Sequence, residues 1–385
     1  MATDQHNRQT DGQNVAGAAQ RIVIILHDLG LGGTERIAIR LANRWARCGR
    51  AVTIFCGVLE GNLVDLVENQ VEVVECDPPI RRGFGSRRRL SAAFKNYVAE
   101  QTPDVVFVPG NFHWPVIGTI RCLPPLGRPA IVAQISSPIR KASRKPWRQR
   151  LWDMQARRKL RGVSRCVSLS PAMTADADAL LGRGLTQCIR LPVLDDYSPQ
   201  PLCAASGGTI LACGRLAREK GFDVALRAFA LLNDPETRLT IVGEGPMQLE
   251  LAALAETLGI SDRVHMPGFV PDVRPWLRRS RVFLLSSHHE GYSAALVEAL
   301  AEGRPVVATE CTPAVAELLT SPGFCRVAPI GNAAALAMGL RQVLDAPAPD
   351  PHVLALSVAG YRIGPISEVY LRLFDEVVAR GQGNG

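Results

Sequence analysis

Short apolar runs rich in β-branched residues recur along this chain, and each run is followed by a stretch with helical spacing. The first run, Arg21–His27, leads into the glycine loop Gly30–Thr34, and Glu35–Arg47 then places apolar residues four positions apart. Buried parallel strands form continuous apolar runs, and four-residue spacing marks one face of a helix. The alternation predicts the α/β class, with doubly wound parallel sheets covered by helices on both faces.

The alternation is interrupted between Leu191 and Gly208, where prolines and glycines gather, and then it resumes. We therefore predict two Rossmann-like domains, 21–190 and 209–365, joined by a linker at 191–208. A final helix is expected at 366–385. The predicted strands are 21–27, 51–55, 71–74, 104–108, 130–134 and 166–169 in the first domain, and 209–213, 239–242, 264–266, 282–285 and 305–308 in the second.

The first twenty residues are polar and offer little to bury, so we interpret residues 1–20 as a disordered leader. They contain no apolar segment of the signal-peptide kind. The chain also lacks a run of about 18 apolar residues, the length that a membrane-spanning helix requires. We therefore expect a cytoplasmic protein.

Ligands of doubly wound domains bind at the carboxyl ends of the strands, so the loops after the strands carry the most information. The loop after 282–285 contains Glu290, and the helix predicted to start near Ser293 contains Glu298. Ser293 is a candidate N-cap, and the free N–H groups of a helix start favour phosphate. The two carboxylates can accept hydrogen bonds from sugar and ribose hydroxyls.

A second loop, after the strand 209–213, carries Arg215 and Lys220. Two cations at a strand's carboxyl end can neutralise a diphosphate and stabilise the charge that develops on it as a leaving group. Surface cations are common, so this signal gains its weight from Glu290 and Glu298 on the same edge of the sheet.

The ordered motifs of the second half resemble the retaining glycosyltransferases of family 4, whose EX7E motif corresponds to Glu290 and Glu298. The resemblance rests on the segments 214–221, 242–246, 267–269, 290–299 and 303–308, and 32–35 matches the N-terminal glycine loop of that family. It implies a GT-B fold, in which two Rossmann-like domains face a cleft and the final helix, 366–385, crosses back to the first domain. It also implies a hexosyltransferase activity.

The resemblance also implies a role for each matching position. Arg215 and Lys220 would bind the donor diphosphate, Glu298 the ribose and Glu290 the donor hexose. Leaving-group stabilisation would rest on the two cations, so no cofactor and no metal is expected. The remaining donor-binding positions are Gly32, Gly33, Gly243, Gly268, Phe269, Val270, Gly291, Tyr292, Ser293 and Ala294.

The acceptor side departs from the family pattern. Many members carry a histidine after the strand that is here 130–134, where this chain has Ser136 and Ser137. His113, which follows the strand 104–108, is the candidate catalytic residue on this side, and the alternative is a histidine that only packs.

Charge is distributed unevenly: residues 1–190 hold 28 Lys/Arg and 15 Asp/Glu, and residues 191–385 hold 16 and 21. The segment 139–165 alone has eleven Lys/Arg and one acid, interleaved with Trp147, Leu151 and Trp152. A solvated face is one interpretation. The other is contact with an anionic membrane surface or a polyprenyl-diphosphate-linked saccharide acceptor on the cytoplasmic face of the membrane, in glycan, exopolysaccharide or lipid-linked saccharide synthesis.

Three other classes of protein share single features with this sequence. A nicotinamide oxidoreductase is disfavoured because Glu35 stands where the third glycine of its fingerprint belongs. A nucleic-acid-binding protein would explain the basic segment but neither the acidic second half nor the paired glutamates, so nucleic acid is not expected as a partner. A GT-B protein of another activity, an epimerase or an inactive homologue, stays open.

Overall fold

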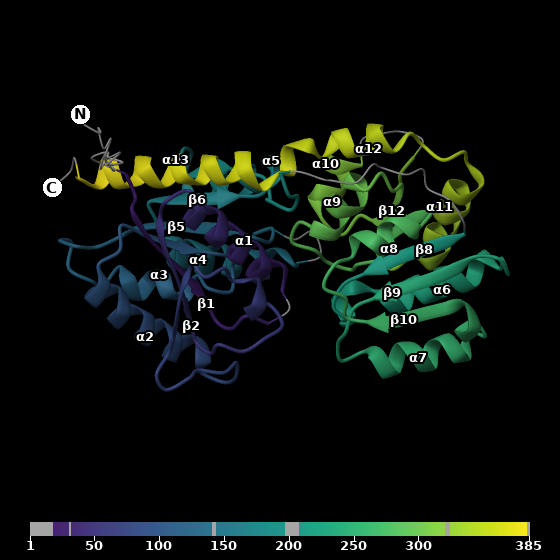
Figure 1. Ribbon diagram of the computed structural model, residues 1–385, viewed down its shortest axis with the longest axis horizontal. Coiled ribbons are helices and arrows are strands. Elements are labelled where there is room, and N and C mark those ends of the chain that lie inside the picture. The colour runs from purple at the N-terminus through teal and green to yellow at the C-terminus, as the bar shows by residue number, and fades with distance from the viewer. Residues whose placement is uncertain (1–17, 31, 141–143, 197–207, 320–323, 383–385) are drawn as a thin grey trace, which may run out of the picture.

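A computed structural model describes residues 18–30, 32–140, 144–196, 208–319 and 324–382. Two α/β domains lie side by side, and a long C-terminal helix runs along the N-terminal one (Figure 1). The predicted fold class is confirmed: both domains are built on parallel sheets.

The described part of the N-terminal domain holds a seven-stranded parallel sheet in the order β3-β2-β1-β4-β5-β6-β7. The order reverses between β1 and β4, so the loops after these two strands flank the point at which such sheets bind ligands. The strands are β1 Arg21–Leu26, β2 Ala51–Cys56, β3 Glu72–Glu75, β4 Val105–Val108, β5 Ala130–Ile135, β6 Arg165–Ser168 and β7 Thr186–Cys188.

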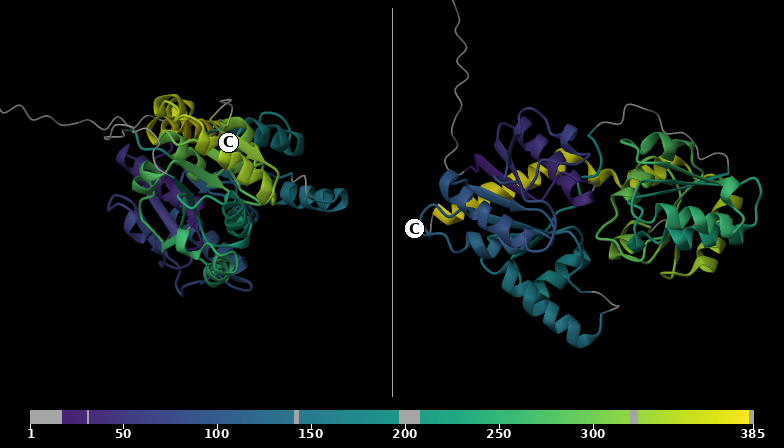
Figure 2. Two further views of the ribbon diagram at one scale, coloured as in Figure 1. Left: turned by 90° about the vertical axis from the view of Figure 1, so that its right-hand side faces the viewer. Right: turned by 90° about the horizontal axis from the view of Figure 1, so that it is seen from below.

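Helices cover both faces of this sheet. On one face α1 packs against the C-terminal helix, and on the other α2, α3 and α4 pack in succession. The α4 helix projects from the body of the domain in the right-hand view of Figure 2. The helices are α1 Gly33–Arg47, α2 Ser86–Gln101, α3 Pro115–Ile120, α4 Pro146–Leu160 and α5 Pro171–Leu181.

The C-terminal domain repeats the plan with the sheet order β10-β9-β8-β11-β12-β13. Here the order reverses between β8 and β11, which places the loops after these strands at the ligand edge. The strands are β8 Thr209–Cys213, β9 Arg238–Val242, β10 Val264–Gly268, β11 Val282–Leu285, β12 Val306–Thr309 and β13 Arg326–Ala328; the helices are α6 Phe222–Leu232, α7 Gln248–Thr257, α8 Arg274–Arg279, α9 Ala294–Ala301, α10 Pro313–Leu318, α11 Ala333–Asp345 and α12 Pro351–Ser357.

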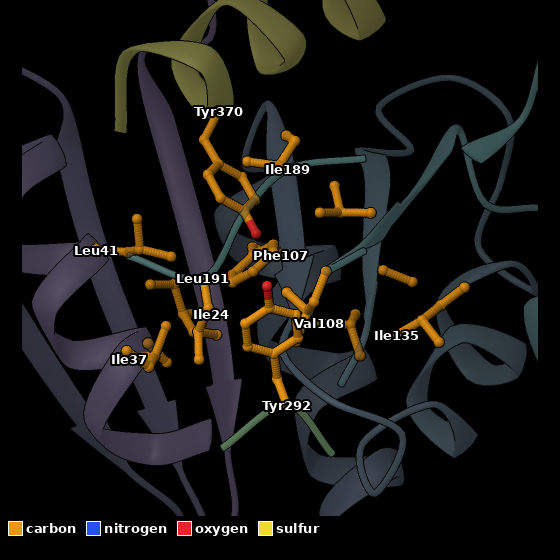
Figure 3. Packing of buried hydrophobic residues seen from close by; sticks show 14 of the residues in the cluster. Ile24, Ile37, Leu41, Phe107, Val108, Ile135, Ile189, Leu191, Tyr292 and Tyr370 are labelled. Carbon is orange, nitrogen blue, oxygen red and sulfur yellow. The ribbon is translucent and has the colours of Figure 1, made fainter. Parts of the chain in front are cut away.

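The C-terminal helix α13, Ile363–Gln382, returns to the first domain, as the trace in Figure 1 shows. Tyr370 inserts from it into the N-terminal core, where Gln134 Nε2 donates to its hydroxyl at 3.0 Å (Figure 3). Phe374, also buried, packs edge-on against Trp45 of α1 with ring centroids 4.9 Å apart. The helix therefore closes the core of a domain from which it is remote in sequence.

Sequence and structure differ at the edges of the predicted elements. The edge strands β7 and β13 were not predicted, because each contributes only three residues. The predicted leader extends too far: Ala19 is buried, and its N–H donates to Asp375 of α13 at 2.8 Å. Residues 1–17 and 197–207 lie outside the described residues, so most of the leader and of the linker prediction stays untested.

No helix in the described part of the chain combines the length and the apolar character needed to cross a bilayer.

Candidate active site

The loops that follow β8 and β11 are bonded to each other. Ser286 Oγ donates to the carbonyl of Lys220 at 3.0 Å, and the N–H of His288 donates to the carbonyl of Glu219 at 2.9 Å. Gly221 permits this approach: its φ is +60°, and a Cβ atom there would lie 2.3 Å from the Ser286 carbonyl oxygen. The pairing fixes Lys220 opposite the β11 loop.

Lys220 and Glu290 form an ion pair across these loops. Lys220 Nζ lies 2.7 Å from Glu290 Oε1, and Ser287 Oγ donates to the same oxygen at 2.9 Å. The two side chains are 24% and 10% exposed, so the ammonium keeps a face toward solvent while the carboxylate is nearly enclosed. The pair presents one oriented acid and one accessible cation.

Glu298 lies half-buried on the second turn of α9. Burial raises the pKa of this carboxyl, and the charges of Arg36 and Arg40 from the N-terminal domain, together with Arg274, oppose the rise. The charges of three arginines from two domains therefore act on one carboxylate.

Cys213 is the last residue of β8 and is close enough to these charged groups to sense them. Burial raises the pKa of its thiol to about 12, and the charges of Glu298, Lys220, Glu290 and Arg36 all act on it. The loops after β8 and β11 thus bring Lys220 and Glu290 into contact, and the charges of Glu298 and of Arg36 from the opposite domain act on the same strand end.

Arg215 takes a more peripheral position on the same loop. Its guanidinium pairs with Glu219 at 2.5 Å, and its side chain is 58% exposed. Arg215 does not join the ion pair of Lys220, although it lies at the same strand end.

The loop Gly291–Ala294 connects Glu290 to α9. Ser293 occupies the N-cap position with a left-handed backbone, φ +71°, and its side chain makes no capping bond. The expected N-cap hydrogen bond was therefore wrong, because N-cap residues reach the helix amides from an extended backbone. The Ser293 Oγ is buried without a partner among the described residues.

The neighbours of Ser293 bind the two domains together. Tyr292 points into the cluster of the N-terminal domain in Figure 3, and its hydroxyl lies 2.5 Å from that of Tyr361. A Cβ atom at Gly291 would lie 2.2 Å from the Ser136 carbonyl oxygen. The backbone of this loop, rather than the Tyr292 side chain, is available to a donor.

The remaining predicted glycines line the strand ends. Gly243 has φ +138°, and a Cβ there would lie 2.0 Å from the Gly214 carbonyl oxygen. Its N–H donates to the carbonyl of Gly268 at 2.8 Å. Beside them, the N–H of Phe269 donates to Glu244 at 3.3 Å, and Val270 packs on the core.

Gly32 and Gly33 begin α1 in the N-terminal domain. A Cβ atom at Gly32 would meet the carboxylate of Glu35 at 2.0 Å, whereas Gly33 has open space around it. A ligand can therefore approach the backbone at Gly33 closely.

A polar pocket of about 200 Å³ opens in the N-terminal domain beside the Gly291 contact. Asn111 organises one wall: its amide donates to the Ser137 carbonyl at 3.1 Å and accepts from the Ser136 N–H at 2.9 Å. The lining consists of Thr34, Glu35, Arg82, Gly110, Asn111, Phe112, His113, Ser136 and Ser137.

Arg82 carries the charge of this pocket and is neutralised within it. Its guanidinium pairs with Asp28 and, at 2.9 Å, with Glu35, and it stacks 4.9 Å from the centroid of the Phe112 ring. Burial raises the pKa of Glu35, and Arg82 opposes the rise. Hydroxyls, an amide, compensated charges and an aromatic face suit a neutral polyol.

His113 is buried and lines the pocket. Its Nδ1 lies 2.6 Å from the Pro109 carbonyl oxygen, and its Nε2 has no partner among the described residues. Burial lowers its pKa to about 4, so the ring is neutral near pH 7. When the proton is on Nδ1, this nitrogen donates a hydrogen bond to the Pro109 carbonyl, and Nε2 is then a hydrogen-bond acceptor.

Reasoning from sequence missed Arg36, Arg82 and Asn111. Nothing local in the sequence marks the pairing of Arg82 with Asp28, which lies 54 positions earlier in the chain. Asn111 stands two positions before His113 and could have been included with it.

Two facing Rossmann-like domains, with a C-terminal helix returned to the first, define the GT-B fold. The family model for "glycosyl transferase 4-like domain" matches residues 32–192, and the model for "glycosyl transferases group 1" matches residues 207–346. Both domains therefore match glycosyltransferase domains, and the chain has the architecture of a GT-B glycosyltransferase.

Known proteins agree with this assignment. The lipopolysaccharide core biosynthesis glycosyltransferase LpsE of Rhizobium meliloti is 37% identical over 105 residues, which cover 27% of this chain and 30% of that protein. An N-acetylgalactosaminyltransferase of Campylobacter jejuni, named for a diphospho-undecaprenol substrate, is 31% identical over 136 residues, 35% of this chain and 37% of that protein. The matches span about a third of these relatives' length.

Solved structures share the whole fold. HepE of Anabaena in complex with UDP superposes with a TM-score of 0.65 at 19% identity, covering 95% of this chain and all of that one. WaaG, described as a glycosyltransferase involved in lipopolysaccharide biosynthesis, gives a TM-score of 0.69 at 19% identity and covers 92% and 99% of the two chains. At this identity the likeness establishes the fold.

Proposed function

We propose that this protein is a retaining hexosyltransferase that moves a hexose from a nucleotide-diphosphate sugar to an acceptor hydroxyl. The observation that carries the proposal is the cluster at the end of β8. There Lys220 and Glu290 form an ion pair, Glu298 follows on the next helix, and Gly291 approaches the carbonyl oxygen of Ser136, which lines a polar pocket of the other domain.

The donor binds on the C-terminal side. Lys220, with its accessible ammonium, takes the diphosphate, and Arg215 adds charge from the loop edge. Glu298 accepts hydrogen bonds from the ribose, while Gly268, Phe269 and Val270 flank the base. The structure of HepE with UDP supports a uridine nucleotide as the first donor to test.

The donor hexose lies between Glu290 and the loop Gly291–Ala294. Glu290 is held in place by Lys220 and Ser287, so it presents an oriented carboxylate to the sugar hydroxyls. The buried Ser293 Oγ has no protein partner among the described residues, and a donor oxygen would satisfy it.

The acceptor hydroxyl approaches from the N-terminal pocket. His113 Nε2 accepts a hydrogen bond from this hydroxyl and orients it. Because the pKa of His113 is about 4, the ring does not hold a proton at neutral pH. The bond between C1 and the phosphate oxygen breaks as the bond between C1 and the acceptor oxygen forms on the same face. The acceptor proton passes to the departing diphosphate, whose charge Lys220 and Arg215 stabilise without a metal.

A thermal-shift panel of UDP-, GDP- and ADP-sugars tests donor binding, since a ligand at about 100 times its Kd stabilises by roughly 2.7 kcal/mol. Transfer is then followed with the donor that binds, in EDTA, and the anomeric configuration of the product is read by NMR. A retained configuration in EDTA supports the proposal. Donor hydrolysis or epimerisation in place of transfer refutes it and favours the GT-B protein of another activity.

We further propose that the protein works at an anionic membrane face, on a lipid-linked acceptor. Exposed Trp147, Leu151 and Met154 stand on α4 among arginines, a combination suited to a bilayer interface. The Campylobacter relative named for a diphospho-undecaprenol substrate supports a lipid-linked acceptor. Flotation with phosphatidylglycerol vesicles but not with phosphatidylcholine vesicles is expected, and equal flotation with both would exclude the idea.

A further inference from the structure

The chain crosses between the two domains twice, and the two crossing segments are hydrogen-bonded to each other. The N–H of Leu194 donates to the Tyr361 carbonyl at 2.9 Å, and the N–H of Ile363 donates to the Leu194 carbonyl at 2.8 Å. Leu194 and Arg362 thereby form a parallel bridge. This pairing fixes the backbone beside Asp195, the residue that follows Leu194 in the chain.

The Asp195 carboxylate pairs with one arginine from each domain. Arg40 of α1 lies in the N-terminal domain, and its Nη2 is 2.9 Å from Asp195 Oδ1. Arg274 of α8 lies in the C-terminal domain, and its Nη1 is 3.1 Å from Asp195 Oδ2. The main-chain carbonyl of Asp195 also accepts from Arg362 Nη1 at 2.9 Å. One carboxylate, with an arginine on each oxygen, therefore bridges the two domains.

Both arginines stand on elements that lead to the proposed donor site. The helix α1 begins at Gly33, about two turns before its arginine, and the backbone at Gly33 is open to a ligand. Arg274 begins α8 shortly after the base-flanking segment 268–270, and its Nε lies 2.9 Å from Asp272 Oδ1 in the same loop. The Asp195 bridge therefore links the glycine loop of one domain to the base loop of the other.

The neighbouring carboxylate, Asp196, makes its contacts within one domain. Its Oδ2 lies 3.3 Å from Arg44 Nη1 of α1, and its Oδ1 accepts from the N–H of Gly364 at 2.6 Å. Gly364 belongs to α13, which packs on the N-terminal domain. The side chains of Asp195 and Asp196 are similarly exposed, at 48% and 39%. Asp196 is therefore a matched control for Asp195.

We infer that Asp195 is a positioning residue, which holds the two domains in their present arrangement through Arg40 and Arg274. The inference rests on the proposed function, since transfer requires the donor site of one domain to face the acceptor pocket of the other. The three side chains are between 23% and 48% exposed, so salt screens their attraction. Exposed ion pairs contribute modestly, and two of them together should shift the ratio of closed molecules, arranged as here, to open ones about fivefold.

Hydrogen exchange measures this ratio, because an amide that is sealed between the domains exchanges in proportion to the open fraction. The backbone of Gly291 packs against the Ser136 carbonyl of the other domain, so a peptide spanning residues 289–294 is the reporter. In low salt, Asp195→Asn should speed its exchange about fivefold, and Asp196→Asn, which loses the same charge, less than about twofold. In about 0.5 M NaCl the wild type and Asp195→Asn should converge. Unchanged exchange in β1 and β8 will show that each domain is intact.

Transfer gives the second readout. With the donor that binds, Asp195→Asn should lower kcat about two- to fivefold in low salt. The affinity for the nucleoside diphosphate should stay within about twofold, because its proposed phosphate contacts, Lys220 and Arg215, both lie in the C-terminal domain. Asp195→Glu keeps the charge and should retain more activity than Asp195→Asn.

Several outcomes would overturn the inference. They are unchanged exchange in Asp195→Asn, an equal change in Asp196→Asn, or a difference that persists in high salt. Faster exchange with unchanged transfer would also refute it, since the bridge would then hold the domains without serving the reaction. The function is tested separately: if no donor supports transfer in the wild type but the exchange differences occur, the transferase proposal fails and the bridge between the domains stands.

Discussion

Replacing Lys220 by methionine removes one ammonium and keeps most of the side-chain volume, so it separates two roles of this residue. Its Nζ lies 2.7 Å from Glu290, and about a quarter of its side chain stays exposed for a diphosphate. A hydrogen bond to a charged group contributes about 1.5–3 kcal/mol. We therefore expect the affinity for the best nucleoside diphosphate of the panel to fall roughly 10- to 150-fold.

The same substitution leaves Glu290 without its cation. Removing one partner of a buried pair costs about 3–5 kcal/mol, and the partial exposure of Lys220 and the remaining Ser287 bond place this case lower, at about 2 kcal/mol. The double variant Lys220→Met/Glu290→Gln removes the unpaired charge. The double variant should regain most of the decrease in melting temperature and none of the affinity for the nucleoside diphosphate.

Isothermal titration with the nucleoside diphosphate, beside the nucleoside without phosphate, reads the two roles apart. The nucleoside should bind the wild type and both variants within about twofold, since it has no phosphate for Lys220 to contact. Recovery of diphosphate affinity in the double variant would show that Lys220 acts only by holding Glu290. An equal loss for nucleoside and diphosphate would mean that the substitution disorders the site.

Three further outcomes follow from the geometry. Glu298→Gln should weaken binding of the nucleoside diphosphate about tenfold, whereas the 2′,3′-dideoxy analogue, which lacks the ribose hydroxyls, should bind the variant and the wild type equally. If titration shows that the substitution weakens both ligands by the same factor, Glu298 does not bind the ribose. Gly291→Ala places a Cβ 2.2 Å from the Ser136 carbonyl oxygen, so we expect transfer to fall about tenfold or more, with a larger radius of gyration in X-ray scattering. His113 has its pKa lowered from 6.5 to about 4, so the native state favours the neutral ring and stability falls as pH drops from 6.5 toward 4, by up to about 3 kcal/mol. Urea titrations should show that His113→Gln loses this acid sensitivity, and the same slope in both proteins would contradict the assignment.

The C-terminal site was predictable because its parts are local. Arg215 and Lys220 follow one strand, Glu290 and Glu298 flank one loop, and the rule that ligands bind at strand ends places both loops on one edge. What sequence could not supply is the backbone of the β11 loop. Ser293 has a left-handed backbone and a hydroxyl without a partner among the described residues, a tertiary result imposed by the packing of Gly291 and Tyr292 against the other domain.

The acceptor pocket was not predictable for the opposite reason. Glu35, Arg82, Asn111 and Ser136 come from four separate segments, and each is an unremarkable polar residue in its own context. Only the strand order, which brings the ends of β1 and β4 together and sets β5 beside β4, assembles them. No residue spacing or local motif in the sequence indicates that Arg82 pairs with Asp28.

The structure explains why serine can replace histidine after β5, at position 136. Ser136 offers its carbonyl oxygen to the approach of Gly291, so this position serves contact between the domains. His113, whose Nε2 has no partner among the described residues, lines the same pocket from the loop after β4, one strand away. We propose that His113 takes the place of the family's histidine from the neighbouring strand end. Ser136→His should then not restore transfer in the His113→Gln variant, because the backbone at position 136 is held in contact with Gly291. Rescue would show that the pocket accepts an imidazole from either strand.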